Sequence, residues 1–378
     1  MEMYVVLKVI WAVLLGVLLS GLGTMVGMDM GVGTLLRFVG KNDGERRVAL
    51  NIIGPHWDGN QVWFILGGGA IFAAFPTLYA TSFSVFYVVM ILLLFSMIMR
   101  PVAFEYRSKA GSTWRATWDW AFLISGALPM IVYGAAFGNV LEGVGYHYSW
   151  TGQYFQDESF LGYLLNPFAV MCGVVSLSLS IAQGGTMLML RGEEPIFGRA
   201  RVAAIGAAVV AAVLFALGGV WVAHMNGFVF TAPVDPNMPA TPLTGQTVGL
   251  APGAWLNNFH AYPLLWALPA IGFVGMLGNA FFNAVRVPVV AWWCGALSWI
   301  GAIFTTGAAM FPFLMPSSTD PNVSLTVWNA TGSQYNLGWM LFFALVFTPI
   351  ILAYTSWCFY VMRGKVKVEN VVNDSHSY

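Results

Sequence analysis

Charged residues are scarce in this chain of 378 residues. Asp, Glu, Lys and Arg together make up 8% of it, whereas an ordinary soluble domain carries about a quarter. Hydrophobic residues account for 58% of the sequence, and its mean hydropathy is +0.73. This balance excludes an ordinary soluble domain and predicts a protein that resides in a lipid bilayer.

Cysteine and histidine are scarce as well. The three cysteines, Cys172, Cys294 and Cys358, show no paired spacing, so neither a disulfide framework nor a metal knuckle is expected. No two of the five histidines share a helix face at a spacing that would ligate haem or metal. We therefore expect the chain itself to ligate neither. A formal net charge of zero argues against nucleic acid as a partner.

Long apolar runs dominate what is present. A membrane-spanning helix needs about 20 mainly apolar residues to cross roughly 30 Å of hydrocarbon. The candidate spans are residues 4–33, 50–75, 78–103, 117–138, 163–188, 202–225, 262–284, 289–313 and 337–361. The first lacks the usual small-residue cleavage site and is expected to be a retained span, not a secretory signal. The predicted fold is an all-α polytopic membrane protein with nine transmembrane helices.

Lys and Arg alternate with the predicted spans. The segments after the first, third, fifth, seventh and ninth predicted spans contain Lys or Arg. The segments after the second, fourth, sixth and eighth spans contain neither Lys nor Arg. Because basic loops stay in the cytoplasm, the pattern predicts an odd number of spans, with the N-terminus outside and the C-terminus in the cytoplasm. Only Lys8 falls outside this pattern.

The spacing of the spans suggests two four-helix bundles and one peripheral helix. We expect the first bundle at 1–140 and the second, with long outer loops, at 141–315. An outer loop, the ninth helix and a cytoplasmic tail would follow at 316–378. Surface loops, not a separate soluble domain, are expected at the long outer connections, 139–162, 226–261 and 314–336.

Three acidic residues lie near the predicted cytoplasmic ends of the first three spans. Asp29 is near the end of the first, Asp58 lies roughly 10 Å into the second at 1.5 Å per residue, and Glu105 follows the third. A carboxylate in hydrocarbon costs at least a few kcal/mol, so such a residue usually serves a substrate, ion or proton path. Asp58 is the strongest candidate, because its near neighbours are polar as well.

Two of these acids also have a plainer explanation. Asp29 can be an interfacial carboxylate that pairs with Arg37 or with another arginine of an inner loop. Glu105 can form a simple surface pair with Arg100 or Arg107. Both interpretations stay open on the sequence alone.

His56, Trp57 and Trp63 flank Asp58. His56 can relay protons because its reference pKa is close to neutrality, or it can be a hydrogen-bonded residue at a helix start. Trp57 and Trp63 can line a hydrophobic route for a gas or a quinone, or they can simply pack.

Several stretches of the sequence resemble one known family. They are GMDMGVG at 27–33, NDGERR at 42–47, PHWDGNQVW at 55–63, RPVAFEYRSK at 100–109, GAW at 253–255, MFPFLMPSS at 310–318 and LTVW at 325–328. In this order, over nearly the whole chain, they are similar to subunit II of cytochrome bd-type quinol oxidases. The segment around Asp58 is highly specific.

The resemblance implies a respiratory-chain complex that oxidises quinol, reduces dioxygen to water and generates a proton-motive force without pumping. Subunit I, the homologous partner, would hold two b-type haems and one d-type haem, and this chain none. The resemblance also implies small single-helix accessory subunits, a structural quinone and a location in the bacterial inner membrane.

Roles for individual residues follow from the same resemblance. Asp58, with Asp29 behind it, matches positions assigned to a proton route from the cytoplasm toward the d-type haem of subunit I. We include His56 and Glu105 in this path. Trp63 matches a position associated with a hydrophobic oxygen entry, and we place Trp57 beside it.

The chain departs from the family pattern at three positions. Val26 stands where better-known members carry an acid, Glu105 replaces an aspartate, and Asn329 stands in place of another. One carboxylate of an inner relay is therefore missing, which leaves Asp58 as the most secure carrier. From the residues alone, a proton-coupled secondary transporter and a structural scaffold with paired acids stay open as alternatives.

Overall fold

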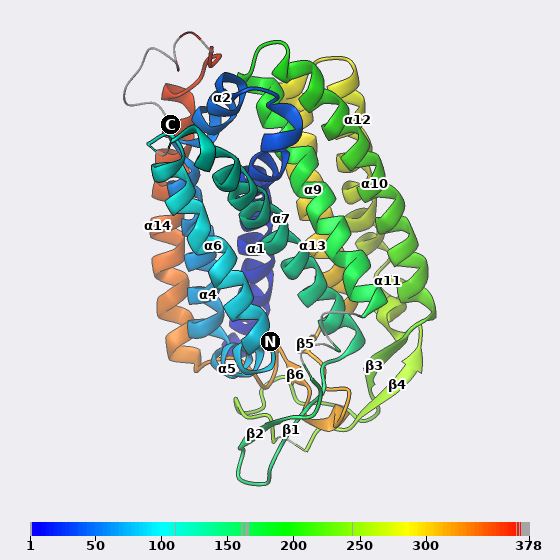
Figure 1. Ribbon diagram of the computed structural model, residues 1–378. Coiled ribbons are helices and arrows are strands. Elements are labelled where there is room, and N and C mark those ends of the chain that lie inside the picture. The colour runs from blue at the N-terminus through cyan, green and yellow to red at the C-terminus, as the bar shows by residue number, and fades with distance from the viewer. Residues whose placement is uncertain are drawn as a thin grey trace.

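The computed structural model describes residues 2–109, 111–159, 162, 166–243, 245–367, 369 and 371. Its long helices run side by side along one axis, with short strands gathered at one end (Figure 1). We call that end the hairpin end, and the opposite one, which carries the basic connections, the basic end. Helix α1 (Met3–Val39) begins at the hairpin end and α14 (Gln334–Val361) finishes at the basic end.

Eight described helices are long and apolar enough to cross a membrane. They are α1 and α14 together with α6 (Tyr87–Arg107), α7 (Ser112–Glu142), α9 (Pro167–Arg191), α10 (Ile196–His224), α12 (Ala267–Ala284) and α13 (Pro288–Met310). A ninth crossing is counted when the bent helix pair within residues 57–85 is taken as one broken span. The predicted all-α polytopic fold is confirmed.

The second predicted span is broken. After α2 (Asp43–Ile53) the chain enters the helical body through the short α3 (Trp57–Asn60) and α4 (Val62–Ala74). α5 (Pro76–Val85) is then bent by 119° from that segment and lies at the hairpin end (Figure 1). Pro76 has no N–H with which to continue α4, but it suits the first turn of a new helix.

The predicted start of the third span, residue 78, was therefore wrong. That residue lies in α5, and the helix that returns to the basic end is α6, which begins at Tyr87. α5 carries no charged residue and continues into the apolar α6, so hydropathy alone does not separate a helix across the bundle end from the spanning helix that follows it.

Helix α1 belongs to one group of four helices and packs against a second group of four. It joins α4, α6 and α7, whereas α9, α10, α12 and α13 form the second group and α14 lies at the edge (Figure 1). Glycines let α1 approach both groups closely. A Cβ on Gly31 would come 1.9 Å from the carbonyl oxygen of Ser180 in α9, and one on Gly126 of α7 would come 2.5 Å from that of Met30. The two bundles and peripheral helix are as expected, while the domain boundaries at 140 and 315 stay a prediction.

Three antiparallel two-stranded hairpins occupy the hairpin end. β1 (Tyr146–Tyr148) pairs with β2 (Tyr154–Gln156), β3 (Asn226–Phe230) with β4 (Val248–Pro252), and β5 (Phe313–Met315) with β6 (Leu325–Thr326). Short helical segments lie in the same connections: η1 (Ala254–Leu256), α11 (Asn257–Ala261), η2 (Pro263–Trp266) and η3 (Pro321–Val323). The sequence predicted surface loops here without strands, because such short strands carry little alternation.

Lys8, the one basic residue outside the alternation, is fully buried in α1 near the hairpin end. Its ammonium group donates to the carbonyl oxygens of Pro236, Met238 and Trp328, at 3.0, 3.1 and 2.6 Å. Three donors meet three acceptors, so burial leaves none of its N–H groups unsatisfied. This lysine therefore joins α1 to the connections at the hairpin end.

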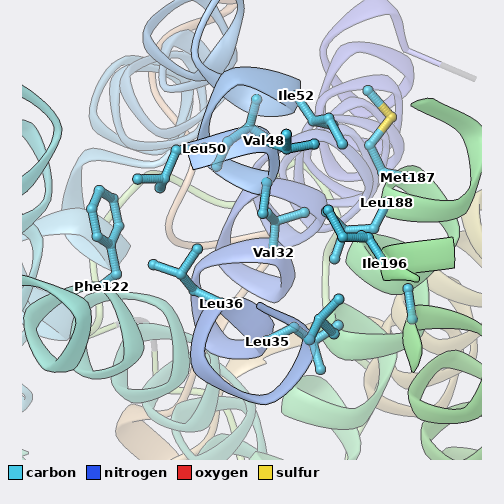
Figure 2. Close-up of a cluster of buried hydrophobic side chains, with 14 of the residues drawn as sticks. Val32, Leu35, Leu36, Val48, Leu50, Ile52, Phe122, Met187, Leu188 and Ile196 are labelled. Atoms are coloured by element: carbon cyan, nitrogen blue, oxygen red, sulfur yellow. The ribbon is translucent and has the colours of Figure 1, made fainter. Parts of the chain in front are cut away.

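A buried hydrophobic cluster fixes α2 at the basic end. Figure 2 shows its side chains converging from several helices: Val32, Leu35 and Leu36 of α1, Val48, Leu50 and Ile52 of α2, Phe122 of α7, Met187 and Leu188 of α9, and Ile196 of α10. Because burial of each such side chain stabilises by about 1.5–3 kcal/mol, α2 is held firmly where the chain turns toward α3.

Candidate functional site

The carboxylate of Asp29 lies in a buried polar cluster between α1 and the start of the broken span. Its side chain is 0% exposed. The side-chain amide of Asn60 in α3 donates to Asp29 Oδ2 at 2.8 Å, and His56 Nδ1 lies 3.7 Å from Oδ1. Oδ1 has no hydrogen-bond partner in the described part of the chain. The structure thus joins Asp29 to His56 through an asparagine, while their common role in a proton path stays a prediction.

His56 is buried immediately before α3, and its two ring nitrogens have different surroundings. The Asn60 amide lies 3.3 Å from Nδ1, so that nitrogen accepts and the network assigns the ring proton to Nε2. Burial, followed by the positive charge of Arg191, lowers the pKa of His56 to about 4. The imidazole is therefore neutral at physiological pH, and its contact with Asp29 is not an ion pair.

Arg100 of α6 supplies the positive charge opposite Asp29. It is 1% exposed, and its charge and that of Asp29 attract each other. One terminal nitrogen lies 2.8 Å from the Met30 sulfur, while Nε and Nη2 have no partner within the described residues. A buried guanidinium with free donors beside a carboxylate with a free oxygen makes a polar site that can bind water or hold a proton.

Asp58 lies on the exposed surface of the chain, not within this cluster. It belongs to the same short helix as Asn60, so the exposed side chain of Asp58 and the buried side chain of Asn60 are separated by about half a helical turn. No side-chain partner is found for Asp58 among the described residues. Its role as a proton carrier stays a prediction. Only another chain or lipid can bury its carboxylate.

Arg37 is not the partner of Asp29, and Glu105 forms the expected surface pair with a different residue. Arg37 donates to the Ala116 carbonyl oxygen, not to Asp29. Glu105 forms a surface pair with Lys109 at 2.8 Å, in which both side chains are more than half exposed. Its proposed part in the proton path remains a prediction.

The two tryptophans of the segment both make packing contacts. Trp57 stacks on Phe104 with ring centroids 4.7 Å apart and planes 10° apart. The Trp63 ring lies against Gly21 of α1, where a Cβ would come within 2.3 Å of it. Packing is thus observed for both residues, and a hydrophobic route beside them stays a prediction.

Buried ion pairs hold the segment that carries the site. Asp119 of α7 is 0% exposed and accepts from Arg107 Nε at 2.6 Å and from Arg46 at 2.8 Å. Arg107 also donates to Asp43 at 3.0 Å. Since Asp43 and Arg46 belong to α2, this network fastens α2 to α6 and α7.

The C-terminal end of α14 covers His56. The rings of Phe359 and His56 lie 4.7 Å apart. Arg191 of α9 donates to the carbonyl oxygens of Ile52 and Met362, which links the end of α2 to the end of α14. The histidine is thus enclosed by two segments that are far apart in sequence.

Sequence reasoning named Asn60 only as a polar neighbour of Asp58, and it did not place Arg100 in the site. A signal for Arg100 was available, because a charged residue inside an apolar run is costly and needs a partner. Within the described residues, no group of three or more His, Cys, Asp or Glu side chains could hold a metal ion.

Comparisons with known proteins agree with the resemblance seen in the sequence. A family model described as cytochrome bd terminal oxidase subunit II matches residues 7–362. Cytochrome bd-I ubiquinol oxidase subunit 2 of Escherichia coli (strain K12) is 47% identical over 99% of each chain. Probable cytochrome oxidase subunit 2 of Haemophilus influenzae is 43% identical over 99% of each chain. For cytochrome bd ubiquinol oxidase subunit 2 of Bacillus subtilis the identity is 31%, over 94% of this chain and 96% of the relative.

A solved structure shares the fold. It is the bd oxidase from Geobacillus thermodenitrificans, with a TM-score of 0.69 over 94% of this chain and 99% of the matched chain. Sequence identity in that match is 14%, so it supports the fold alone. The family match and the full-length relatives decide the assignment, and the chain belongs to the cytochrome bd terminal oxidase subunit II family.

Proposed function

We propose that this chain carries protons from the cytoplasm to the haem-bearing subunit I of its quinol oxidase complex. The chain is the subunit II of an oxygen-reducing quinol oxidase in the bacterial inner membrane. The observation that carries the proposal is Asp29, a buried carboxylate that is attracted by the charge of Arg100 and has one oxygen without a hydrogen-bond partner among the described residues. A buried ionisable group inside a membrane protein usually serves a transport path.

The basic end faces the cytoplasm in this proposal, with the N-terminus outside, because basic loops are retained there. Glu105 collects protons at that surface. Asp29 and His56 form the buried part of the path, in which Asn60 holds the Asp29 carboxylate in place. Asp58, exposed in the isolated chain, lies against subunit I and passes the proton to it.

Oxygen reduction takes place at haems that subunit I holds, two of b type and one of d type in this proposal. The Escherichia coli relative is named a ubiquinol oxidase subunit, and we extend that substrate to this complex. Quinol releases its protons outside while the path takes protons from the cytoplasm. Each elementary charge so separated carries about 2.3 kcal/mol per 100 mV, without a pump.

The same proposal includes a scaffold role toward subunit I, an oxygen entry beside Trp63 and Trp57, a structural quinone and small single-helix accessory subunits. The support for the oxygen entry is the position of Trp63 in the first turn of α4, directly after α3.

The test is oxygen consumption by the purified complex with Asp58→Asn. We expect turnover to fall by at least about tenfold, because a positioned proton donor contributes about 10²–10⁴ in rate, while the haem spectrum stays unchanged. Asp157→Asn is the matched control, since this exposed acid pairs with His147 at the hairpin end and should not alter turnover. Unchanged turnover of the Asp58 variant would refute the proton path.

A pure scaffold is the competing explanation. The attraction between Asp29 and Arg100 favours it, since a paired acid can be structural. In that case Asp29→Asn would lower the stability of the complex and its haem content together, whereas a proton path predicts lower turnover at constant haem content.

A further inference from the structure

A cluster of uncharged polar side chains is buried in the second group of helices, away from the proposed proton path. Gln183 and Thr186 of α9 and Asn279 and Asn283 of α12 are each at most 1% exposed. We call these four residues the amide cluster. Inside a membrane protein a buried polar group without a hydrogen bond costs several kcal/mol, so each donor and acceptor in the cluster needs a partner.

The amide donors of both asparagines are fully used. Asn279 Nδ2 donates to Thr186 Oγ1 at 3.1 Å and to the Ala291 carbonyl oxygen at 2.8 Å. Asn283 Nδ2 donates to Thr186 Oγ1 at 2.8 Å and to Asn279 Oδ1 at 3.1 Å. The single hydroxyl hydrogen of Thr186 goes to the Ala182 carbonyl oxygen at 2.7 Å. A flipped Asn283 amide would set its oxygen against two acceptors, so the network fixes its orientation.

Two carbonyl oxygens are left over. Gln183 Oε1 and Asn283 Oδ1 are buried and have no hydrogen-bond partner in the described part of the chain. A Cβ placed on Gly295 of α13 would lie 1.7 Å from Gln183 Oε1 and 3.2 Å from Asn279 Nδ2. The Gln183 and Asn279 amides thus face each other across Gly295, and the two unpartnered acceptors belong to one cluster.

We propose that the amide cluster binds internal water, which donates its hydrogens to Gln183 Oε1 and Asn283 Oδ1. Water is the small ligand that brings two donors without a charge, and buried waters typically make about three such bonds. The cluster contains no carboxylate, so a cation here would lack charge compensation. Gln183 Oε1 itself occupies the space that a side chain at Gly295 would fill, so an alanine there would displace this acceptor from the cluster.

The direct test is a cryo-electron microscopy map of the whole complex at a resolution that shows ordered water. The expected result is isolated density about 2.7–3.0 Å from Gln183 Oε1 and from Asn283 Oδ1. Absence of density at these oxygens overturns the proposal. So does a peak surrounded by six or more oxygens at about 2.3–2.6 Å, since that geometry marks a cation.

A second test uses the sign of a stability change. Gln183→Met keeps the length of the side chain and removes its amide. The substitution also removes the bond that Gln183 Nε2 donates to the Trp292 carbonyl oxygen at 3.3 Å. If water binds Oε1, two hydrogen bonds are lost, and the apparent Tm of the complex falls by more than in a control variant that loses one buried hydrogen bond. A fall no larger than that of the control overturns the proposal.

Ser298→Ala is the matched control for this substitution. Ser298 is also buried in α13, but its hydroxyl donates to the Gly295 carbonyl oxygen of its own helix. Its loss leaves no other side chain without a partner, so the control should shift Tm less than Gln183→Met. Should Gln183→Met fail to assemble with subunit I, the density map of the natural complex still decides the question.

Discussion

Asp119→Asn should destabilise the protein more than any substitution in its surface ion pairs. The Asp119 carboxylate is fully buried and accepts from Arg107 at 2.6 Å and from Arg46 at 2.8 Å. The Arg107 side chain is itself 1% exposed, so an uncharged amide leaves a buried guanidinium short of negative charge. The side-chain NH2 group of the new asparagine would also point its donors at a guanidinium, where the carboxylate offers an acceptor.

Breaking a buried ion pair from one side costs about 3–5 kcal/mol. With an unfolding entropy of about 2.1 cal/mol/K per residue, a chain of 378 residues that unfolds as one unit loses about 4–6 °C of Tm. The measurement is thermal unfolding of the purified complex followed by tryptophan fluorescence. Because Arg46 belongs to α2, which leads to the His56 segment, oxygen consumption should fall with it.

Glu193→Gln provides the matched comparison. Glu193 pairs with Lys367 at 3.9 Å at the basic end, and both side chains are about half exposed. Exposed pairs contribute about 0–1 kcal/mol, so this variant should unfold within about 1 °C of the natural protein. Equal Tm values for the two variants would refute the idea that burial, and not the mere presence of an ion pair, gives Asp119 its importance.

Two further predictions concern His56 and Gly31. Because its pKa in the folded chain is about 4 against about 6.5 when unfolded, the unfolded state binds more protons between these values, and stability falls by about 3 kcal/mol as pH drops from 6.5 to 4. In His56→Gln, thermal unfolding should depend less on pH in this window, and identical pH profiles would contradict the assignment. Gly31→Ala should lower Tm or prevent assembly, since its Cβ would lie 1.9 Å from the Ser180 carbonyl oxygen, and overpacking costs about 1–3 kcal/mol or more. Gly206→Ala, with open space around its Cβ, is the control, and equal losses in the two variants would contradict the close approach of α1 and α9.

Much of the helical architecture could be predicted from the sequence, because crossing a membrane imposes length and charge rules on each segment. The alternation of basic connections required an odd number of crossings, and the start and end of the described chain do lie at opposite ends of the molecule. The start of the third span was placed wrongly, because α5 is uncharged and continues into α6 but has a different direction. The direction of α5 depends on the break at Pro76 and on tertiary packing, and hydropathy carries information on neither.

Only part of the candidate site could be predicted from the sequence. The acids stood out because a carboxylate in an apolar run is unusual, but the sequence favoured Asp58 as the buried one. In the structure Asp29 is buried, and Asp58 is exposed on the short helix α3. Which side of such a helix faces inward depends on contacts with α1 and α6, and these contacts join residues tens of positions apart.

Lys8 has a consequence for how this protein is made. One of the carbonyl groups that compensate for its burial belongs to Trp328, 320 positions later in the chain. Until that connection has been synthesised, α1 holds a cation that lacks one of its oxygen partners. Helix α1 therefore reaches its native bonding only after the hairpin end of the protein has formed.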